Sequence, residues 1–530
     1  MAMPPSKHSW PLVDEQLSFS VKACWTCRRK RVKCDGRLPT CFKCRTAGRE
    51  CLGYGRNRPL VWAGIASRGK MAGRTFDGQA TASSETPPPT TPPNHEPIMV
   101  AAISNPVFQD LSHQSKQYIS YYLHRCCGEC TLYPDDSKNR FGQFLALIPG
   151  NPVLTHSLIA VSATHQAQEG ISLPGALAES GRAIYHLANW NGSKPLSKSS
   201  LTQHSDALTH SALGIGALRE RLAGTDFSDA LLAAVFLLIW VDVVDSGRSS
   251  WKFHLEGLSV LISLRRTLRA NPDGSANTHF DLDFHNWFEE TFAVLAIFGS
   301  TFTPRMLRLL DIIPKAELKD TLVRVESHTW TGCPADLMLV LHALTMLSSE
   351  ATDPSDREDA ISEWFARLRD FDCASWTEQG PHPSSARGRR ALVEAWKGSI
   401  EIYGRRALGR RAPRRRGKEK EGEDKEEEEL VVPDDLVELT LLYLERIDHR
   451  DMHFKGTVWP LFVVGAEART ARQRRAVTDI ARHLIEYLRM STLHAALVQL
   501  ERIWARSEPY PPGKSWIHDI WERGEGLLLV

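Results

Sequence analysis

The stretch that decides how this chain begins to fold covers residues 23–44, ACWTCRRKRVKCDGRLPTCFKC, and is completed by Cys51. Its cysteines form a C-x2-C-x6-C pattern that repeats after 17 residues. They are Cys24, Cys27, Cys34, Cys41, Cys44 and Cys51. A structural zinc ion takes four ligands, so two separate ions would need about eight thiolates where only six exist. Two thiolates must therefore bridge the ions; an accidental spacing and an unrelated two-site zinc ribbon are the alternatives.

Local signals agree with two metal half-sites. The C-x2-C spacing places two sulfurs on one helical turn, where both face one ion. Thr40 is expected to cap a short helix over residues 41–44, and Gly48 is expected to end it. Asp35 and Gly36 provide the turn that joins the two halves.

The charge of the chain is strongly asymmetric. Residues 22–74 contain 15 Lys or Arg and two acidic residues, a net charge of +13, which leaves 50 basic and 61 acidic residues, or −11, elsewhere. A concentrated basic stretch on an acidic chain is typical of a polyanion partner, most often nucleic acid, although a solvated tail has the same composition. The cysteine pattern favours the nucleic-acid interpretation.

The same residues resemble the fungal binuclear zinc cluster, the two-zinc, six-cysteine DNA-binding domain of fungal transcription regulators. The match includes the basic run RRKRVK, the Cys34-Asp35 pair and the proline two residues before Cys41. The resemblance implies two zinc ions per chain and double-stranded DNA as partner. It also implies that Cys24 and Cys41 bridge the ions, while Cys27 with Cys34 and Cys44 with Cys51 complete the two sites.

The basic residues are concentrated in the first half of the cluster, which is therefore expected to read DNA. The predicted DNA-binding residues are Arg28, Arg29, Lys30, Arg31 and Lys33. Lys and Arg at the end of a helix in the major groove donate to guanine O6 and N7. In the family, a lysine four residues after the second cysteine reads CGG triplets. Here that position is Arg31, and Lys30 precedes it; the same run also matches a nuclear import signal.

The segment after the cluster lacks the coiled coil that many such regulators use to dimerise. Residues 52–71 resemble a basic extension found in some of these fungal regulators, and residues 77–97 form a Pro-, Ser- and Thr-rich linker. Glycines and prolines interrupt any heptad pattern. A homodimer would therefore have to form through the large domain.

From about Phe108 the periodicity is helical, which predicts a mostly α protein with a large helical regulatory domain. Apolar stripes include Leu337, Leu341 and Leu344; Ile361, Trp364, Phe365 and Leu368; and Ile480, Leu484, Ile485 and Leu488. Ser355 with Glu358 suggests a capping box. Residues 229–262 and 459–468 resemble the second type of fungal-specific transcription factor domain. The longest apolar run, residues 230–241, is too short to span a membrane, for which about 20 residues are needed.

Other motifs have ordinary interpretations. No secretory signal precedes the cluster, so the cysteines are expected to be reduced. Cys126, Cys127 and Cys130 are expected to be core thiols, and His254 and His342 core histidines. Ser157, Ser162 and His165 lack a nucleophile-elbow motif, so no enzymatic site is predicted. The arginines of residues 405–416 and the glutamates of residues 418–429 are interpreted as a solvated charged loop.

The expected organisation is a disordered N-terminus over 1–19, a binuclear zinc cluster over 20–56, a basic extension and linker over 57–107, a helical regulatory domain over 108–403, a charged disordered loop over 404–429 and the C-terminal helices of the regulatory domain over 430–530. The predicted function is sequence-specific regulation of RNA polymerase II transcription in the nucleus of a fungus, with the transcription machinery or co-regulators as further partners. The alternative is a DNA-bound repressor or competitor that does not activate.

Overall fold

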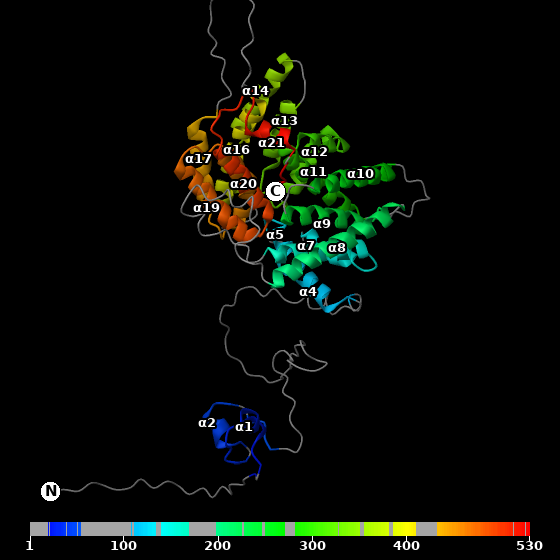
Figure 1. Cartoon of the computed structure of the whole chain (residues 1–530), viewed down its shortest axis with the longest axis vertical. Coiled ribbons are helices and arrows are strands. Elements are labelled where there is room, and N and C mark those ends of the chain that lie inside the picture. Colours follow the sequence, from blue (N-terminus) through cyan, green and yellow to red (C-terminus); the bar gives the residue numbers. More distant parts are fainter. Residues whose placement is uncertain are drawn as a thin grey trace, which may run out of the picture. The chain divides into compact units, whose positions relative to one another are not determined.

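The computed structural model describes residues 20–54 and 108–530, apart from residues 21, 39, 50, 109–110, 134–138, 169–197, 225–226, 246–249, 271–280, 327, 350–353, 381–384, 410–431, 512 and 525. The chain divides into two units, residues 1–95 and 96–530 (Figure 1). The expectations for residues 1–19, for 57–107 and for residues 410–429 of the charged loop lie outside the described residues.

The small unit contains two short helices, α1 (Trp25–Lys30) and α2 (Phe42–Thr46). Its buried centre consists of the thiol groups of Cys24, Cys27, Cys41 and Cys44. Among the described residues of this unit, no aliphatic side chain belongs to that centre. Small domains of this kind depend on a metal or on disulfides for stability. All six cysteines of the unit are free of disulfides.

The large unit is helical, and the described residues include no β-strand. Its α-helices are α4 (His113–Tyr121), α5 (Cys127–Glu129), α6 (Arg140–Gln143), α7 (Pro152–Ala167), α8 (Lys198–Leu222), α9 (Asp229–Asp245), α10 (Trp251–Ala270), α11 (Leu282–Phe302), α12 (Lys315–Glu326), α13 (Ala335–Ser349), α14 (Pro354–Asp370), α15 (Cys373–Glu378), α16 (Ala386–Leu408), α17 (Asp434–Glu445), α18 (Val458–Ala466), α19 (Ala471–Leu488), α20 (Ser491–Trp504) and α21 (Trp516–Arg523). A π-helical turn, Tyr122–Cys126, follows α4, and 3-10 turns cover Phe144–Leu147, Pro304–Ile312 and Met452–Thr457.

One continuous core joins the helices of the large unit. The centre is formed by α9, which is buried on all sides from Ala230 to Trp240, and by α11. Trp396 of α16 stacks on Trp459 of α18, with ring centroids 5.3 Å apart. Because this core takes its members from helices far apart in sequence, the segments on either side of residues 410–431 belong to one folding unit.

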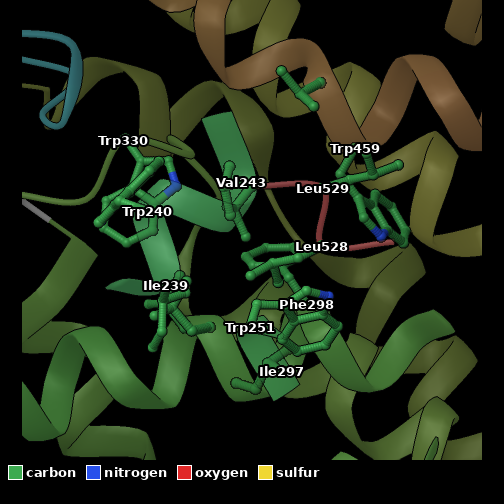
Figure 2. Packing of buried hydrophobic residues seen from close by; sticks show 14 of the residues in the cluster. Ile239, Trp240, Val243, Trp251, Ile297, Phe298, Trp330, Trp459, Leu528 and Leu529 are labelled. Carbon is green, nitrogen blue, oxygen red and sulfur yellow. The ribbon is translucent and has the colours of Figure 1, made fainter. Parts of the chain in front are cut away.

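The end of the chain is part of this core. Leu528 and Leu529 are completely buried, and Figure 2 shows them among Trp251, Phe298 and Trp459. The last residues are not helical, yet they fill space between α10, α11 and α18. The C-terminus therefore contributes packing energy in the way that a core helix does.

The structure confirms the helical fold and most of the predicted stripes. Leu337, Leu341 and Leu344 are buried on α13, and the stripe beginning at Ile480 is buried on α19. In the stripe of α14 only Leu368 is fully buried, so this helix lies at the edge of the core. None of the described helices is both long enough and apolar enough to cross a bilayer.

Two local predictions were wrong. The helix expected to begin with a capping box at Ser355 already begins at Pro354, which places Ser355 inside the first turn. The predicted charged loop was placed from residue 404, but α16 continues to Leu408. It continues because Arg405 pairs with Glu401 one turn earlier, and because Ala407 is buried. The first arginines of that run are therefore structural residues of a helix.

Candidate metal centre and nucleic-acid interface

The first cysteine of each half-site acts as the N-cap of a helix. The Sγ of Cys24 accepts a hydrogen bond from the N–H of Cys27 at 3.3 Å, and the Sγ of Cys41 accepts one from the N–H of Cys44 at 3.3 Å. This contact explains the C-x2-C spacing, since the capping sulfur and the next cysteine lie on the same turn. The prediction that Thr40 caps the second helix was wrong, because the thiol of Cys41 takes that role.

Asp35 joins the two halves in a way that the sequence did not indicate. Its carboxylate accepts hydrogen bonds from the N–H groups of Phe42, at 3.0 Å, and Lys43, at 3.3 Å. These donors are the free N–H groups at the start of α2, where a negative charge is also favoured by the helix dipole. Asp35 therefore fixes α2 relative to the loop that returns Cys34 to the cluster. The hydrogen bonds hold the pKa of Asp35 below its ordinary value.

The turn after Asp35 requires glycine. Gly36 has a φ of 73°, in the left-handed region, and a Cβ at this position would lie 2.5 Å from the main-chain oxygen of Ser20. The N–H of Ser20 donates to the carbonyl of Gly36 at 2.7 Å, so the segment before Cys24 and the loop after Cys34 are held together there. Gly36 has this left-handed conformation at the place where the turn was predicted, and the predicted helix end at Gly48, whose φ is 58°, is confirmed.

The six sulfurs form two overlapping groups. The Sγ atoms of each group lie within 4.8 Å of one another; the groups are Cys24, Cys27, Cys34 and Cys41, and Cys24, Cys41, Cys44 and Cys51. Both contain Cys24 and Cys41, whose sulfurs are 3.7 Å apart. Four sulfurs about 2.3 Å from one tetrahedral zinc ion are about 3.8 Å from each other. The chemistry and spacing of the donors therefore fit zinc.

The protein environment affects the thiols unequally. Burial raises the pKa of Cys24 and Cys41 above the ordinary value, so these two groups form thiolates only with a cation beside them. Burial also acts on Cys34, but hydrogen bonds from the N–H groups of Cys24 and Gly36 outweigh it and lower its pKa to about 7. Zinc bound to such sulfurs displaces their protons outright.

Residues after Cys51 close the cluster. The N–H of Leu52 donates to the hydroxyl of Thr26 at 3.0 Å, and the N–H of Trp25 donates to the carbonyl of Gly53 at 2.9 Å. The hydroxyl of Tyr54 donates to the carbonyl of Arg37 at 2.7 Å. The first two contacts attach the segment after Cys51 to α1, and the third attaches it to the loop after Asp35. Tyr54 is partly buried and packs against the cysteine cluster.

The basic residues lie on the outside of the first half-site. Arg28, Lys30, Arg31 and Lys33 are exposed, and Arg29 belongs to α1 although its side chain lies outside the described residues. Arg28 lies over the ring of Trp25, with its guanidinium carbon 4.4 Å from the ring centroid. Arg31 is the C-cap of α1, with a φ of 55°. The residue expected to read bases therefore lies at the C-terminal end of α1, where the backbone has the left-handed conformation.

The remaining candidates from the sequence are structural. Cys126 and Cys127 are buried, as predicted for core thiols. Across the described parts of the chain, no group of three or more possible metal ligands lies together except in the cysteine cluster. His165 lies 3.0 Å from Glu129 and 2.8 Å from the hydroxyl of Tyr121, contacts that cross-link the core helices. Burial lowers the pKa of His342 to about 4, which keeps this core histidine neutral.

The fold and the site together define a class of protein. A thiolate-rich zinc module with an exposed basic helix, accompanied by a large helical domain, is the architecture of a zinc-dependent DNA-binding regulator. A family model described as fungal specific transcription factor domain matches residues 117–530, and one described as fungal Zn(2)-Cys(6) binuclear cluster domain matches residues 22–59. The chain therefore belongs to the fungal transcription factors that carry these two domains. It binds zinc and DNA, and it is a regulator of transcription, not an enzyme.

Comparison with curated proteins agrees with this family. The acriflavine sensitivity control protein acr-2 of Neurospora crassa is 23% identical over 100% of this chain and 99% of its own length. The phomenoic acid biosynthesis cluster-specific transcriptional regulator of Leptosphaeria maculans is 26% identical over 47% of this chain and 42% of its own. The transcriptional regulatory protein moc3 of Schizosaccharomyces pombe is 32% identical over 12% of this chain and 16% of its own. No solved structure matches the chain significantly.

Proposed function

We propose that this chain is a nuclear regulator of RNA polymerase II transcription that holds two zinc ions and reads DNA triplets of the CGG type. The observation that supports the proposal most directly is the pair of four-sulfur groups that share Cys24 and Cys41. In this arrangement two ions share two thiolates, so six cysteines satisfy two tetrahedral sites. Cys27 and Cys34 complete one site, and Cys44 and Cys51 complete the other.

The role of zinc is to fix α1 so that its basic end is presented to DNA. Both half-sites cap a helix with a cysteine, but only the first carries the dense basic run. Arg31, at the end of α1, is assigned the main contact with guanine O6 and N7, and Lys30 shares it. Arg28, Arg29 and Lys33 are assigned to phosphates, where their charges add affinity without sequence preference.

The helical domain supplies regulation and, as we propose, the contacts of a homodimer and of co-regulators. One relative is named for regulation of a biosynthesis cluster, and we extend that role in secondary metabolism to this chain as part of the proposal. The sign of regulation is tested by fusing residues 100–530 to a neutral DNA-binding domain in a reporter strain. Activation of the reporter supports an activator, and repression supports the alternative of a DNA-bound repressor.

The experiment that tests base reading compares single variants of the full chain on CGG-containing and scrambled duplexes at several salt concentrations. R31A is expected to weaken binding to the CGG duplex by about 1–3 kcal/mol and binding to scrambled DNA much less. R28A is expected to weaken both duplexes similarly and to lower the slope of log affinity against log salt by about 1. R45A, on α2, is the matched control. Equal losses on both duplexes for every variant would refute base reading by α1.

A further inference from the structure

A concave surface on the helical domain has the size of a small-molecule site. The groove has a volume of about 560 Å³ and lies where the ends of α16, α18 and α20 meet the start of α19. Residues 506, 509–511 and 513–516 complete its lining. Small-molecule sites in proteins are clefts of about 300–1,000 Å³. Its described lining contains six basic side chains and one carboxylate, that of Glu467.

Most of the charges in this groove are already paired. Arg405 pairs with Glu401 at 2.9 Å, Arg406 with Glu467 at 2.6 Å, Arg469 with Asp434 at 2.8 Å, and Lys514 with Glu522. The two oxygens of Glu467 are both used by Arg406, and one also accepts from the indole N–H of Trp516. The lining carboxylate is therefore satisfied and does not oppose an anion. Within the described residues, Arg474 and Arg506 have no carboxylate partner.

These two arginines are held in place with their terminal nitrogens unused. The Nε of Arg474 donates to the carbonyl of Ala468 at 3.1 Å, and its guanidinium lies over the ring of Trp504. The Nε of Arg506 donates to the carbonyl of Glu508 at 2.9 Å, and its guanidinium lies 4.3 Å from the ring centroid of Tyr510. In both cases a main-chain carbonyl and an aromatic ring fix the plane of the guanidinium. The terminal N–H groups find no acceptor among the described residues.

The indole ring of Trp504 is itself anchored. The indole N–H of Trp504 donates to the carbonyl of Gly465 at 2.8 Å, which ties the end of α20 to α18. Guanidinium groups fixed in this way donate two parallel hydrogen bonds to a phosphate or carboxylate without losing side-chain freedom on binding. Partial burial also lowers the pKa of Arg474, as expected for a charge that lacks a partner.

We infer that this groove binds a small organic anion, a phosphate ester or a polycarboxylate, through the guanidinium groups of Arg474 and Arg506, which both line it. The proposed ligand is a small molecule because the groove is concave, has the volume of a small-molecule site and is lined by α16, α18, α19, α20 and the segment that follows α20. The bound anion would join α19 to residues 506–510 and so stabilise the helical domain. The site gives the regulator a chemical input that is separate from its zinc cluster.

The test uses the full chain and measures the melting temperature of the helical domain with inorganic pyrophosphate or citrate at constant ionic strength. Constant ionic strength is necessary because such salts stabilise many proteins without binding. We expect a saturable rise with at least one of the two anions. A rise in melting temperature with pyrophosphate alone indicates that the ligand is a phosphate ester. A rise with citrate alone indicates that it is a polycarboxylate.

Variants separate binding from general salt effects. R474Q and R506Q are each expected to lower the affinity for the anion at least tenfold. R475Q is the control, because Arg475 is exposed on α19 and lies outside the groove, and it is expected to keep the affinity of the unaltered chain. Because Arg506 is exposed, R506Q still tests the site if R474Q fails to fold. An equal response of R475Q and R506Q, or no saturable rise, would overturn the inference. Reduced DNA affinity of R506Q without any anion would show a DNA contact instead, and would also overturn it.

Discussion

Leu528→Ala tests whether the end of the chain belongs to the core of the helical domain. Leu528 is completely buried beside Trp251 and Phe298. The substitution removes three carbon atoms, worth about 2.4 kcal/mol of lost burial at about 0.8 kcal/mol each. The cavity that remains adds to this, because the surrounding rings relax only partly. The expected total is about 3–4 kcal/mol, a large fraction of the about 5–15 kcal/mol that stabilises a typical domain.

The assay is urea unfolding of the full chain followed by circular dichroism at the helical signal. Leu528→Ala is expected to shift the midpoint to lower urea with an unchanged slope. Leu439→Ala is the matched control, since Leu439 is 49% exposed on α17 and its truncation should cost less than about 0.5 kcal/mol. Equal midpoints for the two variants would show that the last four residues are not part of the cooperative core, and the reasoning from burial would fail.

Three further predictions concern the cluster, a buried acid and the charged segment. Gly36→Ala is expected to weaken zinc binding about tenfold or more, measured by chelator competition, whereas Gly48→Ala, whose Cβ meets nothing within 4 Å, should weaken it less. Burial raises the pKa of Asp242 to about 7, so the folded state holds this proton more tightly than the unfolded state does. The free energy of unfolding therefore falls as pH rises from about 4 to 7. Asp242→Asn should flatten that part of the pH–stability profile, and an unchanged slope of the profile would refute the assignment. Deleting residues 410–429 should leave the melting temperature of the helical domain nearly unchanged, and a loss of cooperative unfolding would show that the segment is structural.

The cysteine spacing was sufficient to predict the metal centre. The spacing predicted that the six thiols gather at one place, and the structure brings their sulfurs together in two overlapping groups. The assignment of Cys24 and Cys41 as the bridging pair came from the family resemblance and stays a prediction. The cap at Thr40 was predicted from ordinary helix statistics, in which hydroxyl and carboxylate side chains dominate. That preference failed because the metal-site sulfur of Cys41 already occupies the capping position. The role of Asp35 was missed because its partners are seven and eight residues away.

Periodicity predicted the helices of the large domain but not their arrangement. The stripe of Leu337, Leu341 and Leu344 identifies a buried face without saying which helix covers it. The stacked pair Trp396 and Trp459 joins residues that are far apart in sequence, and no local pattern connects them. The same limit applies to the groove, because Arg474 and Arg506 come together only through tertiary packing.

The measurement that tests the central claim most directly is the number of zinc ions per chain, determined by native mass spectrometry of the full protein and of two cysteine variants. The account predicts two zinc ions for the unaltered chain. It predicts weakened binding of both ions in Cys24→Ser, whose sulfur belongs to both groups, and weakened binding of mainly one ion in Cys34→Ser, whose sulfur belongs to one. A single zinc ion per chain, or a Cys24→Ser variant that keeps one ion at full affinity, would contradict the shared-thiolate cluster.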